Sequence, residues 1–138
     1  MILELKNTSD IPFVAQEFLE NFGHNSVFAF DGEMGVGKTT FITGLLTAMG
    51  IEEIDGSPTY SIVNSYQSLM FGKVYHLDVY RLNDESEAMD FGIEEMFYSG
   101  SICLVEWPEK IKNLLPDNTI WVYIRKKEDN TRIITIEQ

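Results

Sequence analysis

The sequence predicts a single α/β domain, residues 1–138, with a mixed, mainly parallel central sheet and a C-terminal β-hairpin. Two short apolar runs, 27–30 and 101–105, have the continuity of strands that are buried on both faces of a parallel sheet. A glycine-rich loop and then a helical pattern follow the first run, as in the strand–loop–helix units of α/β folds. The length suits one domain, and no linker or internal repeat interrupts the chain.

The N-terminal part of the chain predicts a strand, a helix, a buried strand and a second helix. Residues 2–5 fit an edge strand, and the polar residues 8–10 that follow are suitable N-caps. The first helix has one apolar face, accommodates Pro12 in its first turn and ends at Gly23. Apolar residues at helical spacing after the glycine-rich loop predict a second helix that stops at Gly50.

The remainder of the chain predicts two strand pairs, one buried strand and two helical segments. Glycine and proline mark most of the boundaries between them. In order we expect strands 61–66 and 73–80 joined by a turn near Gly72, an acidic helical segment 83–97 broken at Gly92, strand 101–105, a short helix from Pro108 that ends before Pro116, and strands 119–124 and 133–137 paired around residues 127–130.

The glycine-rich loop, residues 32–40, fits the phosphate-binding pattern G-x-x-x-x-G-K-[ST] at every fixed position. Gly32 and Gly37 let the backbone approach phosphate closely, and inward N–H groups with the helix N-terminus attract the anion. Lys38 supplies a positive charge to the β- and γ-phosphates, and Thr39 offers a hydroxyl to Mg²⁺. A P-loop NTPase domain is therefore expected, with nucleotide contacts from Glu33, Met34, Gly35, Val36, Gly37, Lys38, Thr39 and Thr40.

A P-loop enzyme also needs a carboxylate at the end of a neighbouring strand to hold the Mg²⁺ shell. Glu106 directly follows the buried strand 101–105, and Asp78 lies near the end of the strand 73–80. For each, the alternative is an ordinary solvated acid at a strand end. A structural role is more common than a catalytic one for a residue such as His76. Thr59 is placed either as a switch residue that senses the γ-phosphate or as a plain turn residue.

Composition limits the compartment and the partners. The net charge is −12, and a chain with only ten Lys and Arg residues is poorly suited to grip RNA by itself. No apolar run is long enough to span a membrane and no signal peptide is recognised, so a cytoplasmic protein is expected. Cys103, the one cysteine, excludes an internal disulfide and is expected to pack as a small apolar residue. One basic corner on this acidic body is expected near the C-terminus, made by Arg125, Lys126, Lys127 and Arg132. Such a charge distribution leaves room for a protein partner.

Four motifs together resemble the TsaE family, bacterial P-loop ATPases required for threonylcarbamoyl modification of adenosine in tRNA. The P-loop alone indicates only a superfamily, whereas the third and fourth motifs are far more specific. The resemblance spans roughly residues 8 to 136 and is weakest beyond Pro116. In order, the motifs are the P-loop 32–40, Ser-Pro-Thr-Tyr at 57–60, His-Leu-Asp-Val-Tyr-Arg at 76–81, and Val-Glu-Trp-Pro-Glu at 105–109.

The resemblance implies an ATPase that uses ATP and Mg²⁺ and acts with two partners, TsaB and TsaD. TsaD transfers the group to tRNA, and ATP hydrolysis by the family's protein is thought to reset the complex, so that tRNA is met only indirectly. By the same resemblance, Lys38 would bind phosphate, Thr39 and Glu106 would hold Mg²⁺, and Asp78 would lie near the γ-phosphate or its water. Thr8 and Arg132 would contact the adenine side.

Two other functions remain open from the residues alone. A small-molecule P-loop kinase would need an acceptor site and usually an arginine-bearing lid, but only Arg81 lies in the middle of the chain and no insertion has the length of a lid. A non-catalytic nucleotide switch would use bound nucleotide only to control docking. The destination of the phosphate, to water, to an acceptor or nowhere, separates the three functions.

Overall fold

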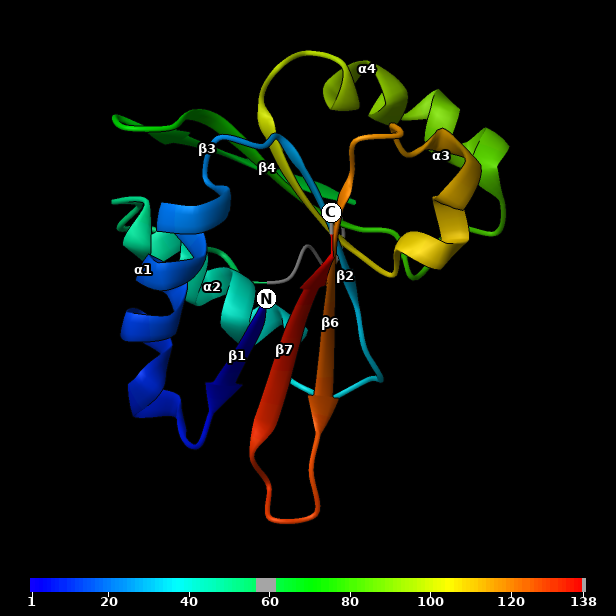
Figure 1. Cartoon of the computed structure of the whole chain (residues 1–138). Helices are drawn as coiled ribbons and strands as arrows, with labels where there is room; N and C mark the ends of the chain where they lie inside the picture. The colour runs from blue at the N-terminus through cyan, green and yellow to red at the C-terminus, as the bar shows by residue number, and fades with distance from the viewer. Residues whose placement is uncertain (57–61, 138) are drawn as a thin grey trace.

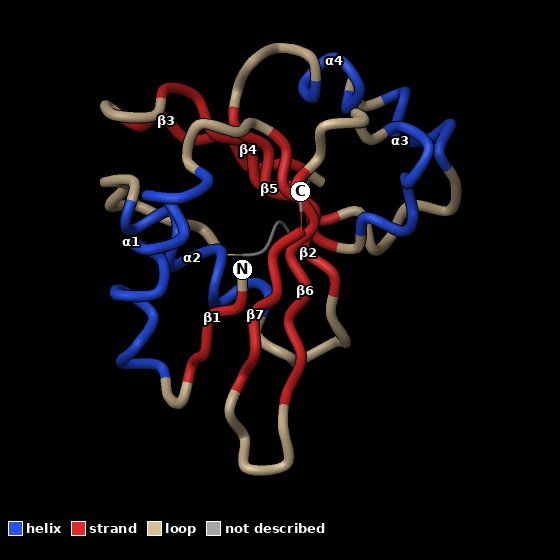
Figure 2. Tube along the Cα trace, in the orientation of Figure 1, coloured by secondary structure: helices blue, strands red, loops and turns tan. Residues whose placement is uncertain are grey.

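The computed structural model describes residues 1–56 and 62–137, in which seven strands form one sheet (Figure 1). Its strand order is β1-β7-β6-β2-β5-β4-β3 (Figure 2). The centre, β6-β2-β5-β4, is parallel, while β1-β7, β7-β6 and β4-β3 pair antiparallel, which confirms the mixed sheet. The strands are β1 (Ile2–Leu5), β2 (Val27–Asp31), β3 (Val63–Ser68), β4 (Gly72–Asp78), β5 (Ile102–Glu106), β6 (Ile120–Lys126) and β7 (Arg132–Glu137).

Helices cover both faces of the sheet, in separate groups (Figure 1). On one face α1 (Ile11–Phe22) and α2 (Lys38–Ala48) pack against a large apolar cluster; the Phe18 ring of α1 lies 5.4 Å from that of Phe28 and 5.8 Å from that of Phe41. A smaller cluster, which includes Leu77 and Cys103, lies on the other face. It packs with α3 (Glu85–Asp90), α4 (Ile93–Phe97) and the 3₁₀ helix η2 (Pro108–Leu114).

Burial along the strands follows their place in the sheet. All five residues of β5 and the first four of β2 are buried, as expected for central parallel strands covered on both faces. β6 alternates instead, because Ile120, Val122 and Ile124 join the large cluster while the residues between them are only partly buried. The hairpin of β6 and β7 confirms the expected C-terminal pair.

Several strand boundaries in the structure differ from the predicted ones. The strand expected at 61–66 is β3, which begins at Val63 and runs to Ser68, and the strand expected to reach residue 80 ends at Asp78. Just past this end, the N–H of Tyr80 turns back to donate to Oδ1 of Asp78. Gly92, at φ +71°, separates α3 from α4 and confirms the predicted break. The motif at 57–60, with Thr59, lies outside the described residues.

Asp10, one of the predicted N-caps, holds the N-cap position of α1 but makes no side-chain cap hydrogen bond there. The side-chain cap is made one turn earlier by Asn7, at the start of the short 3₁₀ helix η1 (Thr8–Asp10): its Oδ1 accepts from the N–H of Ser9 at 3.0 Å. Asp10 completes the capping box because its carboxylate accepts from the Asn7 N–H at 3.3 Å. This arrangement fixes the path of the chain from β1 into α1.

Two further contacts set the positions of α1 and β1. A Cβ atom at Gly44 in α2 would collide with Cγ2 of Ile11, so glycine there allows the two helices to approach closely. β1 pairs with β7 and with no other strand in the described residues, which brings the start of the chain beside the C-terminal hairpin (Figure 2).

Two of the compositional expectations can be compared with the structure. Cys103 is fully buried, and burial raises the pKa of its thiol to about 12, so it packs as the expected small apolar residue. None of the helices in the described residues has both the length and the apolar character needed to cross a membrane.

Candidate nucleotide-binding site

The glycine-rich loop connects β2 to α2, as the sequence predicts. Gly37 has φ +109°, a backbone conformation that side-chain-bearing residues rarely adopt, and the next residue, Lys38, begins α2. At Gly32 the constraint is space, because a Cβ atom would lie 2.7 Å from Cγ1 of Val36 and 3.0 Å from the carbonyl oxygen of Ile124. The tight turn of the loop therefore explains why glycine is needed at both positions.

Lys38 is buried, and its amine is held under the loop. Nζ donates to the carbonyl oxygen of Gly32 at 2.6 Å and lies 3.3 Å from the centroid of a Trp107 ring. Removal from water lowers the pKa of Lys38, and the negative charges of nearby acids, Glu106 first among them, oppose that shift. A poorly hydrated ammonium is well suited to attract a phosphate oxygen.

Glu106, at the end of β5, joins the P-loop helix to β4. It is only 2% exposed, and its Oε1 accepts from the Thr39 hydroxyl at 2.8 Å. Its Oε2 lies 2.6 Å from Nε2 of His76, which is fully buried. The structure thus brings together the two residues that the family resemblance assigned to Mg²⁺, and adds a histidine to them.

Asp78 is the neighbour of Glu106 across the parallel pair β4–β5. Its side chain is partly buried, and it interacts with other groups besides the Tyr80 N–H, which donates to Oδ1 at 3.1 Å. Both candidate carboxylates therefore lie at the carboxyl edge of the sheet, next to the P-loop, where α/β folds bind their ligands. Glu106, rather than Asp78, makes the contact with Thr39.

The chemistry of the Thr39 hydroxyl and the Glu106 carboxylate fits a Mg²⁺ ion. Mg²⁺ prefers oxygen ligands, keeps several waters and is usually bound by one or two carboxylates together with substrate phosphates. Within residues 1–56 and 62–137, no group of three or more His, Cys, Asp or Glu side chains has the geometry of a metal cage. The two oxygens present match a site in which water and nucleotide complete the shell.

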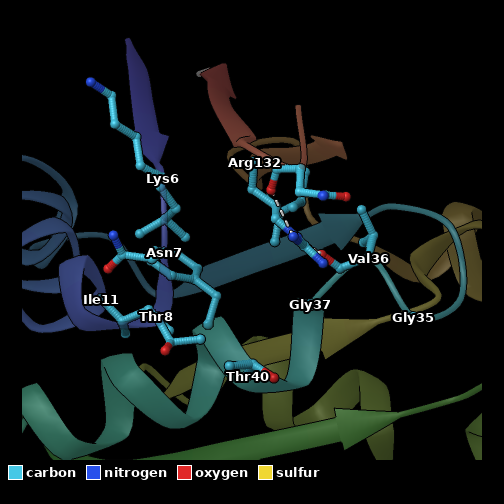
Figure 3. A pocket seen from close by; sticks show the side chains of 13 residues that line it. Lys6, Asn7, Thr8, Ile11, Gly35, Val36, Gly37, Thr40 and Arg132 are labelled. Atoms are coloured by element: carbon cyan, nitrogen blue, oxygen red, sulfur yellow. Dashed lines mark hydrogen bonds between the residues drawn. The ribbon is translucent and has the colours of Figure 1, made fainter. Parts of the chain in front are cut away.

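A pocket opens on the side of the P-loop away from Glu106 and Asp78 (Figure 3). Thr8 and Arg132, both predicted to lie on the adenine side, line it, although they are 124 positions apart in the sequence. The Arg132 guanidinium is anchored there, because Nε donates to the Val36 carbonyl at 3.1 Å and an Nη donates to that of Asn130 at 2.8 Å. The lining residues are Leu5, Lys6, Asn7, Thr8, Ile11, Gly35, Val36, Gly37, Thr40, Phe41, Ile124, Asn130 and Arg132.

Among the residues predicted for nucleotide contact, Gly35, Val36, Gly37 and Thr40 line the pocket, whereas Lys38 and Thr39 face the acids. Exposed side chains of the loop, Glu33 and Met34, are not in the pocket lining. Trp107 entered the sequence analysis only as part of the fourth motif, with no role of its own. One signal, a large aromatic residue directly after the acid that ends a buried strand, marks it in the sequence. Asn7, Lys6 and Asn130 carried no such signal.

Comparison with known proteins agrees with these features. Residues 5–134 match the family "Threonylcarbamoyl adenosine biosynthesis protein TsaE". The tRNA threonylcarbamoyladenosine biosynthesis protein TsaE of Bacillus subtilis is 40% identical over 109 residues, which cover 79% of this chain and 67% of that protein. The protein of the same name from Borreliella burgdorferi is 32% identical over 137 residues, which cover 99% of this chain and 98% of that one.

A solved structure is also similar over nearly the whole chain. The crystal structure of Bacillus subtilis YdiB aligns with a TM-score of 0.79 at 28% identity, and the match covers 99% of this chain and 83% of YdiB. The family match, the curated relatives and the fold agree. The chain belongs to the TsaE family of tRNA threonylcarbamoyladenosine biosynthesis proteins.

Proposed function

We propose that this protein is a Mg²⁺-dependent ATPase that supports threonylcarbamoyl modification of tRNA by resetting a complex of TsaB and TsaD. The observation that carries the proposal is the contact between the Thr39 hydroxyl and the buried Glu106 carboxylate, next to the P-loop lysine. P-loop NTPases hold Mg²⁺ with this pairing of a P-loop hydroxyl and an acid at the end of a neighbouring strand.

The chain's own residues have separate roles in this proposal. Lys38 exchanges the Gly32 carbonyl for a phosphate oxygen, which makes its desolvated charge available to the β- and γ-phosphates. Thr39 and Glu106 would hold Mg²⁺, which when bound neutralises charge that develops on the phosphates. Asp78, beside Glu106 in the sheet register, orients the attacking water. Thr8 and Arg132 hold the adenine side of ATP in the pocket that they line.

We further propose that hydrolysis is slow until the partners bind. An arginine directed at the γ-phosphate can accelerate phosphoryl transfer by about 10³- to 10⁵-fold. Arg125 donates to Asp31, and Arg132 donates to two backbone carbonyls, so both guanidinium groups are already used. A cation or an ordered loop supplied by a partner would complete the site.

The direct test measures ATP hydrolysis by the purified protein alone and with TsaB and TsaD, using Lys38→Ala as the inactive control. We expect a low rate alone and a large increase with both partners. Equal rates in the two conditions would exclude activation by the partners. The label from γ-³²P ATP should appear as free phosphate; label on a small acceptor would favour a kinase, and intact ATP in every mixture would favour a non-catalytic switch.

The cellular test is nucleoside mass spectrometry of tRNA after depletion of this protein. Threonylcarbamoyladenosine should decline, and wild-type protein should restore it while Lys38→Ala should not. A normal level of the modified nucleoside after depletion would contradict the proposed pathway role, whatever the result of the ATPase assay.

A further inference from the structure

His76 is a polar residue in an apolar layer. Side chains alternate along a strand, so Val74, His76 and Asp78 share the face of β4 that is directed towards α1 and α2. Val74 on that face, and Leu104, which is the register partner of His76 on β5, belong to the apolar cluster under these helices. An imidazole buried in this layer is costly unless its polar atoms are satisfied.

The only hydrogen bond recorded for the His76 ring in the described residues is the one to Glu106. Nε2 lies 2.6 Å from Oε2 of Glu106, whereas Nδ1 is buried and has no partner among the described residues. Two lone pairs would repel at this distance, so a proton lies between the two atoms, and a carboxylate, which can only accept, takes it from Nε2–H. Glu106 is therefore the hydrogen-bond partner of the ring among the described residues, and Nδ1 is left unsatisfied.

The same contact restrains the acid. The terminal torsion of a glutamate is broad, so a single hydrogen bond to Oε1 does not fix the plane of the carboxylate. With Oε2 held by His76 and Oε1 accepting from Thr39, both oxygens of Glu106 are fixed relative to the P-loop helix. A buried pair of this kind contributes little to stability compared with apolar residues of similar size, so stability is a weak explanation for it.

We propose that His76 is a positioning residue, whose Nε2–H holds one oxygen of Glu106 so that the other stays directed to Thr39 and to Mg²⁺. The inference rests on the proposed function, because it assigns His76 a role through the acid that would hold the metal. In metal sites, a side chain that orients a ligand commonly changes metal affinity by about 10- to 100-fold when it is removed.

The binding experiment titrates Mg²⁺ and follows binding of a non-hydrolysable ATP analogue to the parent and three variants. His76→Leu removes the donor and keeps an apolar side chain of similar size, His76→Gln keeps an N–H donor, and Val74→Ala disturbs packing on the same strand face without touching Glu106. We expect His76→Leu to need about tenfold more Mg²⁺ for half-maximal binding. His76→Gln should recover part of that loss, and Val74→Ala should match the parent.

A measurement without nucleotide or metal checks the geometry. Nitrogen-15 NMR of the imidazole groups reports which ring nitrogen is protonated, and the only other histidine, the exposed His24, is assigned with a His24→Gln variant. We expect a proton on Nε2 of His76. An Nδ1–H ring without a proton on Nε2 could not donate to Glu106 and would overturn the proposal.

The outcomes separate the inference from the function on which it rests. If the parent binds the analogue with Mg²⁺ but His76→Leu has the same Mg²⁺ requirement, His76 is only structural and the ATPase proposal stands. If the parent shows Mg²⁺-dependent binding and no hydrolysis even with its partners, the ATPase proposal fails while the positioning role remains. A parent that needs no Mg²⁺ for binding contradicts both.

Discussion

On one side of Lys38 lie Glu106 and His76, which are 2% and 0% exposed, whereas the pocket on the other side is lined in part by exposed residues such as Thr8 and Asn130. The first side is built by side chains of two neighbouring parallel strands that contact each other directly. The second side is built by loops and strand ends that are brought together by β1 and the C-terminal hairpin. The charged groups therefore lie in a buried layer, and the expected base contacts lie on a more exposed surface.

The largest effect is expected at Lys38, which lies between the two sides. Lys38→Ala should lower partner-stimulated ATP hydrolysis by at least about 100-fold, since removing one preorganised group that stabilises transition-state charge costs about 10²- to 10³-fold. The melting temperature should stay the same or rise, because a desolvated cation is removed. Hydrolysis near the parent rate by a folded variant would contradict the assignment of the P-loop lysine.

Glu106→Ala tests the buried side by both activity and stability. Hydrolysis should lose its normal Mg²⁺ dependence, and the free energy of unfolding should fall by about 1–3 kcal/mol, because the buried Nε2–H of His76 loses its acceptor. Steady-state assays over a Mg²⁺ titration and urea denaturation measure the two effects. Mg²⁺ curves that overlay those of the parent would show that Glu106 does not hold the metal.

Asp78→Ala separates turnover from stability at the same edge of the sheet. The hydrolysis rate should fall, because Asp78 is proposed to orient the attacking water. The free energy of unfolding should change by less than for Glu106→Ala, because Asp78 is more accessible than Glu106. Nucleotide affinity should be retained because Lys38 and the loop remain. A variant with the parent rate would show that Asp78 takes no part in the reaction, and a variant less stable than Glu106→Ala would show that burial does not separate the two acids.

The smallest effect is expected in the pocket. Arg132→Ala should weaken ATP binding only severalfold, because Arg132 is only partly buried and already donates to the Val36 and Asn130 carbonyls. The Mg²⁺ requirement should be unchanged, unlike that of Glu106→Ala. Isothermal titration calorimetry at several Mg²⁺ concentrations gives both quantities, and a shifted Mg²⁺ requirement would show that the two sides are coupled.

The residues of the buried side were largely predictable, and their contacts were not. An acid directly after a buried strand pointed to Glu106, and the fixed positions of the P-loop pointed to Lys38 and Thr39. The contact between His76 and Glu106 depends on which strands are neighbours and in what register, and both follow from packing of the whole sheet. The position of Trp107 over Lys38 depends on a left-handed backbone at Trp107, φ +61°. Residues other than glycine rarely adopt this conformation, so the sequence does not predict it.

The pocket was less predictable because its residues meet through long-range pairing. Thr8 and Arg132 were named from family resemblance, and the structure places both in one pocket, although a nucleotide role for either stays a prediction. Asn7 and Asn130 carried no pattern of their own. They reach the pocket because β1 pairs with β7 across almost the whole length of the chain, and no local propensity encodes such a pairing.

The pairing of β1 with β7 also has a consequence for synthesis on the ribosome. Leu3 pairs with Ile134 and Leu5 with Arg132, so the first strand must wait until nearly all of the chain has emerged before it can join the sheet. A nascent chain that already contains the P-loop still lacks the Arg132 side of the pocket beside it. The pocket beside the P-loop is therefore complete only after translation has passed the hairpin, and we expect incomplete chains to lack the proposed contacts on the adenine side of ATP.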